Sequence, residues 1–240
     1  MKFNTLCLIF LLVLSLVLLP VGVSAGEVSL VSGTGTDTAG ISLTDTVADP
    51  LNAALYSFGT WSSATVTSWG DVITPWYDKN TAPFGGSGAE WISTAAIHEN
   101  PNDLNEWRLF KQVFSIPIGS TINSALLSYT ADNAVAVYLN GIEVASTVSV
   151  YGAQPVSTTY TFQSFFGVDL SSYLHNGVNE LEFVLRNWQN PVDAANPTGL
   201  IYSGTVEYST PAPEFPTLFV PITMIIGFIG VVFLIQKKKF

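Results

Sequence analysis

The sequence predicts an all-β protein, with a β-sandwich ectodomain between an N-terminal signal peptide and one C-terminal transmembrane helix. Three observations lead to this fold class. Apolar and polar residues alternate in several runs between residues 107 and 208, and this period of two is typical of half-buried strands. Turn-forming residues separate the runs at regular intervals, which favours a sandwich. Each end of the chain carries a long apolar stretch with a basic flank.

Six segments are predicted along the chain. They are a signal peptide (1–25), Gly/Ser/Thr-rich N-terminal strands and loops (26–60), a β-sandwich domain (61–208), a Pro-rich linker (209–216), a transmembrane helix (217–235) and a basic cytoplasmic tail (236–240). The span rests on 21 mostly apolar, uncharged residues from Phe215 to Ile235, enough to cross a bilayer. The lysines that follow are expected to stay cytoplasmic, which places the sandwich outside the cell.

The N-terminus has the three parts of a secretory signal peptide. Lys2 supplies the charge, residues 6–19 form the apolar core, and small residues precede an expected cleavage before Gly26. An uncleaved anchor helix is the alternative. The single cysteine, Cys7, lies within this peptide, so the mature chain is expected to have neither a disulfide nor a thiolate metal site.

The mature ectodomain is strongly acidic. Residues 26–213 contain 17 acidic and four basic residues, a formal charge of −13. Such a balance argues against nucleic acid as a partner, because phosphate must be neutralised by Lys and Arg. It suits a soluble protein at a cell surface, although many secreted domains are simply acidic.

The first strands are expected in "EVSLV" and "AGISL", and aromatic-rich loops between short strands are expected over 61–106. The longer strands follow. Their inward positions are predicted to be Phe110, Phe114 and Ile116 (with Gln112 as an exception), then Ala125, Leu127, Tyr129 and Ala131, and then Val135, Val137 and Leu139. Asn140-Gly141 predicts a two-residue hairpin turn, because both residues tolerate positive φ.

The last part of the domain is expected to hold three more strands. "TYTFQSFFGV" predicts one, and Asp169 or Ser171 is expected to cap a short helical turn that ends at Asn176-Gly177. In "NELEFVLRN" the alternation places three apolar residues inward and three charged residues in water. The inward set is Leu181, Phe183 and Leu185, and the outward set is Glu180, Glu182 and Arg186. "LIYSGTVEY" predicts the final strand.

The order "FSIP … ALLSYTADNAVAVYLNG … VDLSSYLHNGVNELEFVLRN" resembles a galactose-binding-domain-like β-sandwich, a jelly roll. The resemblance covers residues 107–208, or 60–208 with the tryptophan-rich region. It implies a fold found in carbohydrate-binding modules and in accessory domains of glycosidases. Because this fold serves many roles, the resemblance does not define a ligand.

No catalytic motif is found in the sequence: there is no G-x-S-x-G, H-E-x-x-H, P-loop or Rossmann fingerprint. His98 and His175 lack a nucleophile or second ligand at motif spacing, which favours surface or structural roles. Paired acids without fixed spacing can cleave glycosides. The candidates lie near the tryptophans: Asp71, Asp78, Glu90, Glu99 and Asp103. In an acidic protein such residues are usually only solvated.

A sugar-binding site is the more plausible chemistry. In "SWGDVITPWYDKN", Trp69, Trp76 and Tyr77 offer flat aromatic faces, with Asp78 (and Asp71 or Asn80) as hydrogen-bonding partners. The alternative is that these rings pack at the open ends of the sandwich.

No cofactor is predicted. Sandwiches of this resemblance often hold a structural calcium ion, and Asp132-Asn133 offers oxygen ligands. The same pair is also ordinary turn chemistry, and the chain has no D-x-D-x-D-G loop, so calcium stays unassigned.

The C-terminal tail contains Pro213, Glu214 and Phe215, then the apolar span, then Lys237, Lys238 and Lys239. This order resembles the PEF-CTERM sorting signal of archaeal surface proteins. The resemblance implies processing by an archaeosortase, which would remove the span and attach the new C-terminus to a lipid, much as a GPI signal is processed. A proline linker that holds the domain away from the membrane is the alternative.

These features together predict an exported cell-surface protein with a PEF-CTERM-type anchor. Its expected role is non-enzymatic, as an envelope or extracellular-matrix component that contacts glycans. A dedicated carbohydrate-binding module and a glycosidase are the alternatives.

Overall fold

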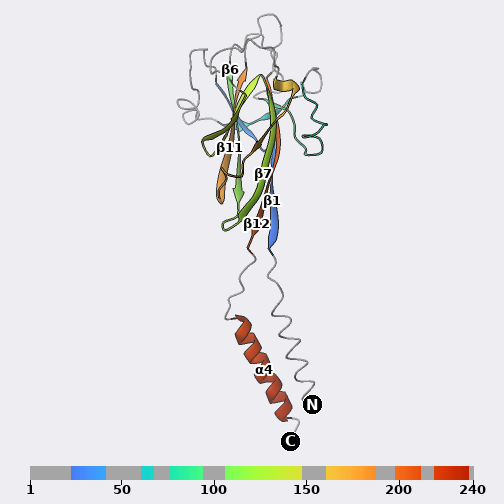
Figure 1. Cartoon of the computed structure of the whole chain (residues 1–240), viewed down its shortest axis with the longest axis vertical. Coiled ribbons are helices and arrows are strands. Elements are labelled where there is room, and N and C mark those ends of the chain that lie inside the picture. Colours follow the sequence, from blue (N-terminus) through green and yellow to red (C-terminus); the bar gives the residue numbers. More distant parts are fainter. Residues whose placement is uncertain are drawn as a thin grey trace, which may run out of the picture. The chain divides into compact units, whose positions relative to one another are not determined.

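Two six-stranded sheets form the body of the protein (Figure 1). The computed structural model describes residues 23–41, 61–67, 76–93, 106–147, 161–187, 198–211 and 219–237. Sheet A contains β10 (Phe166–Asp169), β7 (Thr121–Asp132), β12 (Gly199–Thr210), β5 (Ile92–Ser93) and β4 (Thr65–Val66) in that order, and β1 (Ser24–Val31) also pairs with β12. Sheet B contains β3 (Ser62–Ser63), β2 (Asp37–Ile41), β6 (Glu106–Ile116), β11 (Gly177–Asn187), β8 (Ala134–Leu139) and β9 (Ile142–Ser146).

The main core lies between the two sheets, which confirms the predicted all-β, two-layer body. The predicted inward side chains of β6, β7, β8 and β11 are all buried in one cluster. Phe183 of sheet B stacks on Tyr202 of sheet A, with ring centroids 4.5 Å apart. Alternation therefore identified the inner face of these four strands correctly, because that face meets the opposite sheet.

Gln112, the polar exception on the inner face of β6, has a partner in the core. The Tyr202 hydroxyl donates a hydrogen bond to Gln112 Oε1 at 3.1 Å. Thr36 Oγ1 lies 2.6 Å from the same hydroxyl, and because Tyr202 has one proton to give, Thr36 is the donor to it. A buried polar chain thus joins β12 to β6 with its groups satisfied.

The predicted hairpin turn at Asn140-Gly141 is confirmed. Both residues have positive φ, 54° and 77°, and they connect β8 to β9, as a type I′ turn requires. The fully buried Asn179 holds the turn: its Oδ1 accepts a hydrogen bond from Asn140 Nδ2 at 3.0 Å. Its Nδ2 donates to the carbonyl oxygen of His175 at 2.8 Å.

The segment expected to be one strand over "TYTFQSFFGV" is different in its described part. A 3₁₀ turn, η1 (Thr161–Gln163), precedes the short strand β10. The helical turn expected next is a single hydrogen-bonded turn, in which Asp169 Oδ1 accepts from the Ser171 amide at 2.8 Å. The hydroxyl of Ser171 and, to a smaller extent, its amide lower the pKa of Asp169. Local capping was predicted correctly, but the run was too short to continue as helix.

The prediction that Glu182 and Arg186 face water is wrong. Glu182 is 3% exposed and Arg186 is fully buried. Their strand neighbour Val184 and the β8 residues Ala134 and Ala136 are also fully buried. Sheet B therefore has much of its outer face buried as well, which alternation along one strand does not reveal.

The chain divides into two units, one over Ala25–Ser209 that holds the sandwich and one formed by the terminal residues. The described element of the second unit is helix α4 (Phe219–Lys237). Pro221 lies in its first turn, where the missing amide proton breaks no helical hydrogen bond. A search of the described residues finds no helix with the combined length and hydropathy of a membrane span. The predicted transmembrane helix is therefore not shown.

Candidate functional site

The candidate site is built on the segment 76–91, which packs on the outer face of sheet A. Along β12, Leu200 and Tyr202 point into the main core, whereas Ile201 belongs to a second cluster with Trp76 and Trp91. Gly199 allows this packing, because a Cβ there would lie 2.6 Å from the Trp76 ring. We call Trp76, Tyr77, Phe84, Trp91, Phe162 and Phe165 the aromatic cluster.

Hydrogen bonds fix the backbone of this segment. The Asp78 carboxylate accepts from the amide of Asn80 at 2.8 Å and from its side-chain nitrogen at 2.9 Å, which closes an Asx turn. The Tyr77 amide donates to the Phe162 carbonyl at 2.7 Å. Lys79 and Glu90 form an ion pair at 2.7 Å. These contacts fix the conformation of segment 76–91 and so hold its aromatic rings in place.

Trp76 and Trp91 form the buried part of the aromatic cluster. Their ring centroids are 4.3 Å apart, and Trp76 is only 7% exposed. Each indole N–H has a partner: Trp91 donates to the Tyr77 carbonyl at 3.1 Å, and Trp76 donates to Asp132 Oδ2 at 3.0 Å. This is the packing role that the sequence left open for Trp76, and its ring does not form an open platform.

Asp132 is a buried carboxyl group behind the aromatic cluster. It is 4% exposed, and Asn133 Nδ2 donates to its Oδ1 at 2.8 Å. Burial raises the pKa of Asp132 to about 8, although the hydrogen bond from Trp76 lowers it. The group is therefore mostly neutral at pH 7. The described residues contain no group of three or more His, Cys, Asp or Glu side chains that could hold a metal ion.

The partly buried Tyr77 and the exposed Phe165 form the outer part of the aromatic cluster. Phe165 is 45% exposed, and its ring meets Tyr77 edge to face, with centroids 5.5 Å apart. Phe84 supports both rings from below, 5.7 Å from Tyr77 and 6.5 Å from Phe165. The polar side chains of Asp78 and Asn80 are exposed next to Tyr77 in the sequence. The surface thus offers two held aromatic rings beside hydrogen-bonding groups.

The structure keeps part of the predicted ligand site together. Trp76, Tyr77 and Asp78 are adjacent, with Trp76 turned into the packed layer. The remaining candidates Trp69, Asp71, His98, Glu99 and Asp103 lie outside the described residues. Sequence reasoning missed Phe165 and Trp91, and it considered Asp132 only as a calcium ligand or a turn residue. Burial of Trp91 and Asp132 depends on β12 and on loop packing, and Phe165 lies far from Tyr77 in the sequence, so no local pattern signals their meeting.

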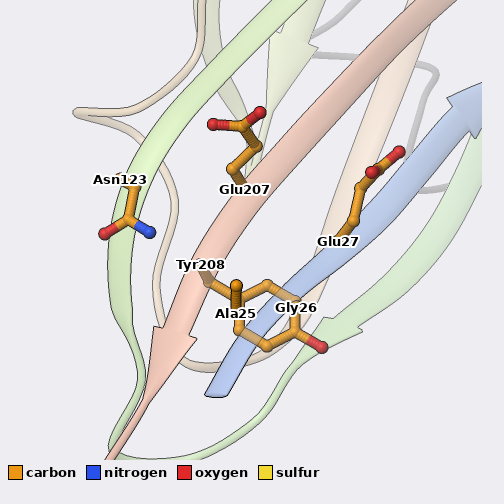
Figure 2. Close-up of a pocket in the computed structure, with 6 residues that line it drawn as sticks. All are labelled: Ala25, Gly26, Glu27, Asn123, Glu207 and Tyr208. Carbon is orange, nitrogen blue, oxygen red and sulfur yellow. The ribbon is translucent and has the colours of Figure 1, made fainter. Parts of the chain in front are cut away.

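An open pocket of about 370 Å³ lies at the other end of β12 (Figure 2). It is lined by Ala25, Gly26, Glu27, Asn123, Glu207 and Tyr208. The Tyr208 ring crosses β1 at Gly26, where any Cβ would collide with it. Ser124 Oγ donates to Glu207 Oε2 at 2.9 Å. These contacts hold β1, β7 and β12 together. The acidic side chains of Glu27 and Glu207 both line the pocket.

The predicted sorting residues Pro213, Glu214 and Phe215 lie outside the described residues, as do Lys238 and Lys239. Lys237 is the last residue of α4. The described structure therefore does not test the sorting motif.

No protein-family model matches the chain, and no curated protein matches its sequence. Solved structures with partial likeness include a protein from Bacteroides fragilis that carries the name β-galactosidase (14% identity, TM-score 0.42, 75% of this chain and 23% of that chain). A β-glucuronidase from an uncultured Clostridium species (11%, 0.36, 78% and 30%) and a β-glucuronidase from glycoside hydrolase family 2 (13%, 0.39, 75% and 18%) are others. The chain spans less than a third of each protein, and likeness at this level assigns it no activity.

Proposed function

We propose that this protein is an exported, surface-tethered β-sandwich that contacts glycans through Tyr77 and Phe165 without catalysing a reaction. The observation that carries the proposal is the exposed Phe165 ring, held edge to face against Tyr77 on a braced loop. An exposed aromatic ring offers a large apolar area that a ligand can cover. A ring that is already ordered loses little conformational freedom on binding.

Glycans suit this surface because sugars present apolar C–H faces next to hydroxyl groups. Aromatic rings offer large apolar area, and Asp78 and Asn80 supply polar groups beside Tyr77. The formal charge of the ectodomain is strongly negative, which favours neutral over anionic glycans. The chain would act as an envelope or matrix component, or as a carbohydrate-binding module.

The roles of the described acids near the aromatic cluster support a non-enzymatic function. Asp78 closes the Asx turn, Glu90 is paired with Lys79, and Asp132 is buried behind Trp76. A glycosidase needs two carboxyl groups on opposite sides of a scissile bond. No such use is left for these three.

The tether rests on the sequence. Residues 213–215 are Pro-Glu-Phe, the stretch 215–235 is uncharged, and three lysines follow it. The exposure of apolar side chains on α4 supports the same proposal, since Ile226 is 63% and Phe228 54% exposed. Such side chains would be buried if the helix lay in an apolar surrounding. Processing by an archaeosortase-type enzyme would replace this anchor with a lipid.

The glycan contact is tested with the full chain in detergent on a glycan array, followed by titration of any sugar that binds. Phe165→Ala should weaken binding about tenfold or more, because the contact loses an aromatic face worth on the order of 1–3 kcal/mol. Val178→Ala, an exposed apolar residue on sheet B, is the matched control. Absence of binding to every glycan, or equal affinity of both variants, would remove this function.

The tether is tested separately in the native cell by mass spectrometry of the mature C-terminus. A terminus near Pro213 with added lipid mass is the expected result for processing. An intact Phe240 terminus in the membrane fraction would leave a plain anchor and end the sorting proposal. Recovery of the intact chain in the soluble fraction would overturn the tether itself.

A further inference from the structure

We propose that protonation of Glu182, which lies beside Glu180 and Lys111, stabilises β8 and β11 on the outer face of sheet B. We call these three residues the latch. The latch is closed, with Glu182 protonated, in mild acid, and it is loosened above neutral pH. This inference is independent of glycan binding and of the tether. It rests on a row of polar residues that crosses the sheet in register.

The row runs perpendicular to the strands. Lys111 of β6 pairs with Glu182 of β11, and Glu182 pairs with Tyr138 of β8. Tyr138 in turn pairs with Glu143 of β9 and donates a hydrogen bond to its Oε2 at 2.7 Å. Paired residues on one face of a sheet have Cβ atoms about 4.5–5.5 Å apart. Each of these four side chains is therefore in contact range of the next one in the row.

The row marks a border between two halves of the same face. On one side, the outward residues Leu109, Val184 and Ala136 are fully buried. On the other, Val113 and Val178 are exposed. Glu182 itself is 3% exposed, whereas the Glu180 side chain is 40% exposed. A change of charge at Glu182 therefore takes place at the edge of the buried half of this face, where it affects how tightly the buried side chains pack.

The described neighbours of Glu182 do not supply enough positive charge for an ionised pair. Glu180, two residues away on the same face, is a second carboxyl group, and its charge opposes ionisation of Glu182. Lys111 lies 4.0 Å from Glu180 Oε1 and 4.1 Å from the centre of the Trp61 ring. Tyr138 gives its one proton to Glu143, and Asp37 of β2 adds another acid beside Lys111. One lysine therefore faces several carboxyl groups.

A proton on Glu182 resolves this imbalance. It removes one buried charge and lets Glu182 donate a hydrogen bond to Glu180. Burial, the hydrogen bond with Glu180 and the charge of Glu180 raise the pKa of Glu182 to about 7, against a smaller lowering by Lys111. Because the folded pKa exceeds the unfolded value of 4.5, the latch is fully closed below about pH 4.5, weakens as the pH rises to about 7, and stays weak above it.

The test measures hydrogen exchange of β8 and β11 amides in the full chain from pH 4.5 to 8.5, corrected for the intrinsic pH dependence of exchange. Protection should fall as the pH rises towards 7. In Glu182→Gln these amides should exchange more slowly than in the wild type at pH 8, by up to about tenfold for each unit by which folding raises the pKa of Glu182. Any fall that remains should match the global loss of stability caused by Asp132. Glu207→Gln, an exposed acid of sheet A, should leave the fall unchanged.

Two further variants keep the proposal testable if Glu182→Gln fails to fold. Glu180→Gln should move the midpoint of the fall to lower pH, because it removes the repelling charge. Lys111→Met should move the midpoint to higher pH, because it removes the cation. Asp132→Asn, on the other sheet, should leave the local fall on β8 and β11 in place. Protection that does not change with pH, or midpoints that do not move in these opposite directions, would refute the latch.

Discussion

The outer faces of the two sheets are both partly buried, but by different chemistry. On sheet A the aromatic cluster covers β12, and the buried acid Asp132 receives hydrogen bonds from Trp76 and Asn133. On sheet B the buried outer face includes Glu182 and Arg186. The first layer is held by apolar area and neutral hydrogen bonds. The second depends on charge balance, and such layers are sensitive to pH and to the loss of a single partner.

The largest loss of stability is expected from Trp91→Ala in the aromatic cluster of sheet A. Trp91 is nearly fully buried between Trp76 and Gly199, so its removal leaves a large cavity and should cost about 3–5 kcal/mol. Urea denaturation at pH 6 measures the loss. Val113→Ala on the exposed half of sheet B should change stability by less than about 0.5 kcal/mol. A similar small effect for Trp91→Ala would mean that the aromatic cluster contributes little.

Asp132→Asn tests the buried acid of sheet A, for comparison with Glu182 on sheet B. The folded pKa of Asp132 is raised to about 8 from 3.8, so wild-type stability should fall between about pH 4 and pH 8 and then level off. The fall should reach a few kcal/mol, below the roughly 5 kcal/mol that four pKa units would give without structural relaxation. The asparagine resembles the neutral acid in shape and should flatten this part of the curve. Thermal melts of both proteins across pH 4–9 provide the measurement.

A smaller effect is expected from Gly199→Ala, which tests how closely the aromatic layer approaches β12. The new Cβ would lie 2.6 Å from Trp76 and 3.1 Å from Trp91, and such overpacking costs about 1–3 kcal/mol. Gly35→Ala is the matched control, since nothing lies within 4 Å of its Cβ position. Equal denaturation midpoints for the two variants would contradict the close packing.

The smallest effect is expected from Tyr138→Phe on sheet B. It removes the hydrogen bond to Glu143, and because Glu143 is exposed, the loss should be about 0.5–1 kcal/mol. The midpoint of the pH-dependent protection of β11 should stay near that of the wild type, since Tyr138 gives its proton to Glu143 and not to Glu182. A shift of the midpoint would show that Tyr138 belongs to the latch.

The inner faces of the long strands could be predicted from the sequence, because the alternation within each strand shows which of its faces is apolar. Phe110, Leu127, Val137 and Phe183 were all assigned correctly on that basis. The outer faces were not readable, because burial there depends on segments far away in the chain. Glu182 has the sequence context of a solvated residue, and Trp76 has that of a ligand platform. For the candidate site, the sequence located Tyr77 and Asp78 but had no means of pairing Tyr77 with Phe165.

Strand β1 has a consequence for the order of folding. It pairs with β12, and Ser32 bonds to the carbonyl oxygen of Tyr202, 170 residues later in the chain. Sheet A is therefore completed only after almost the whole chain has been synthesised. Contacts of such long range slow folding. Until then β1 and β7 lack the strand that lies between them, and their unpaired edges are open to pairing with other chains.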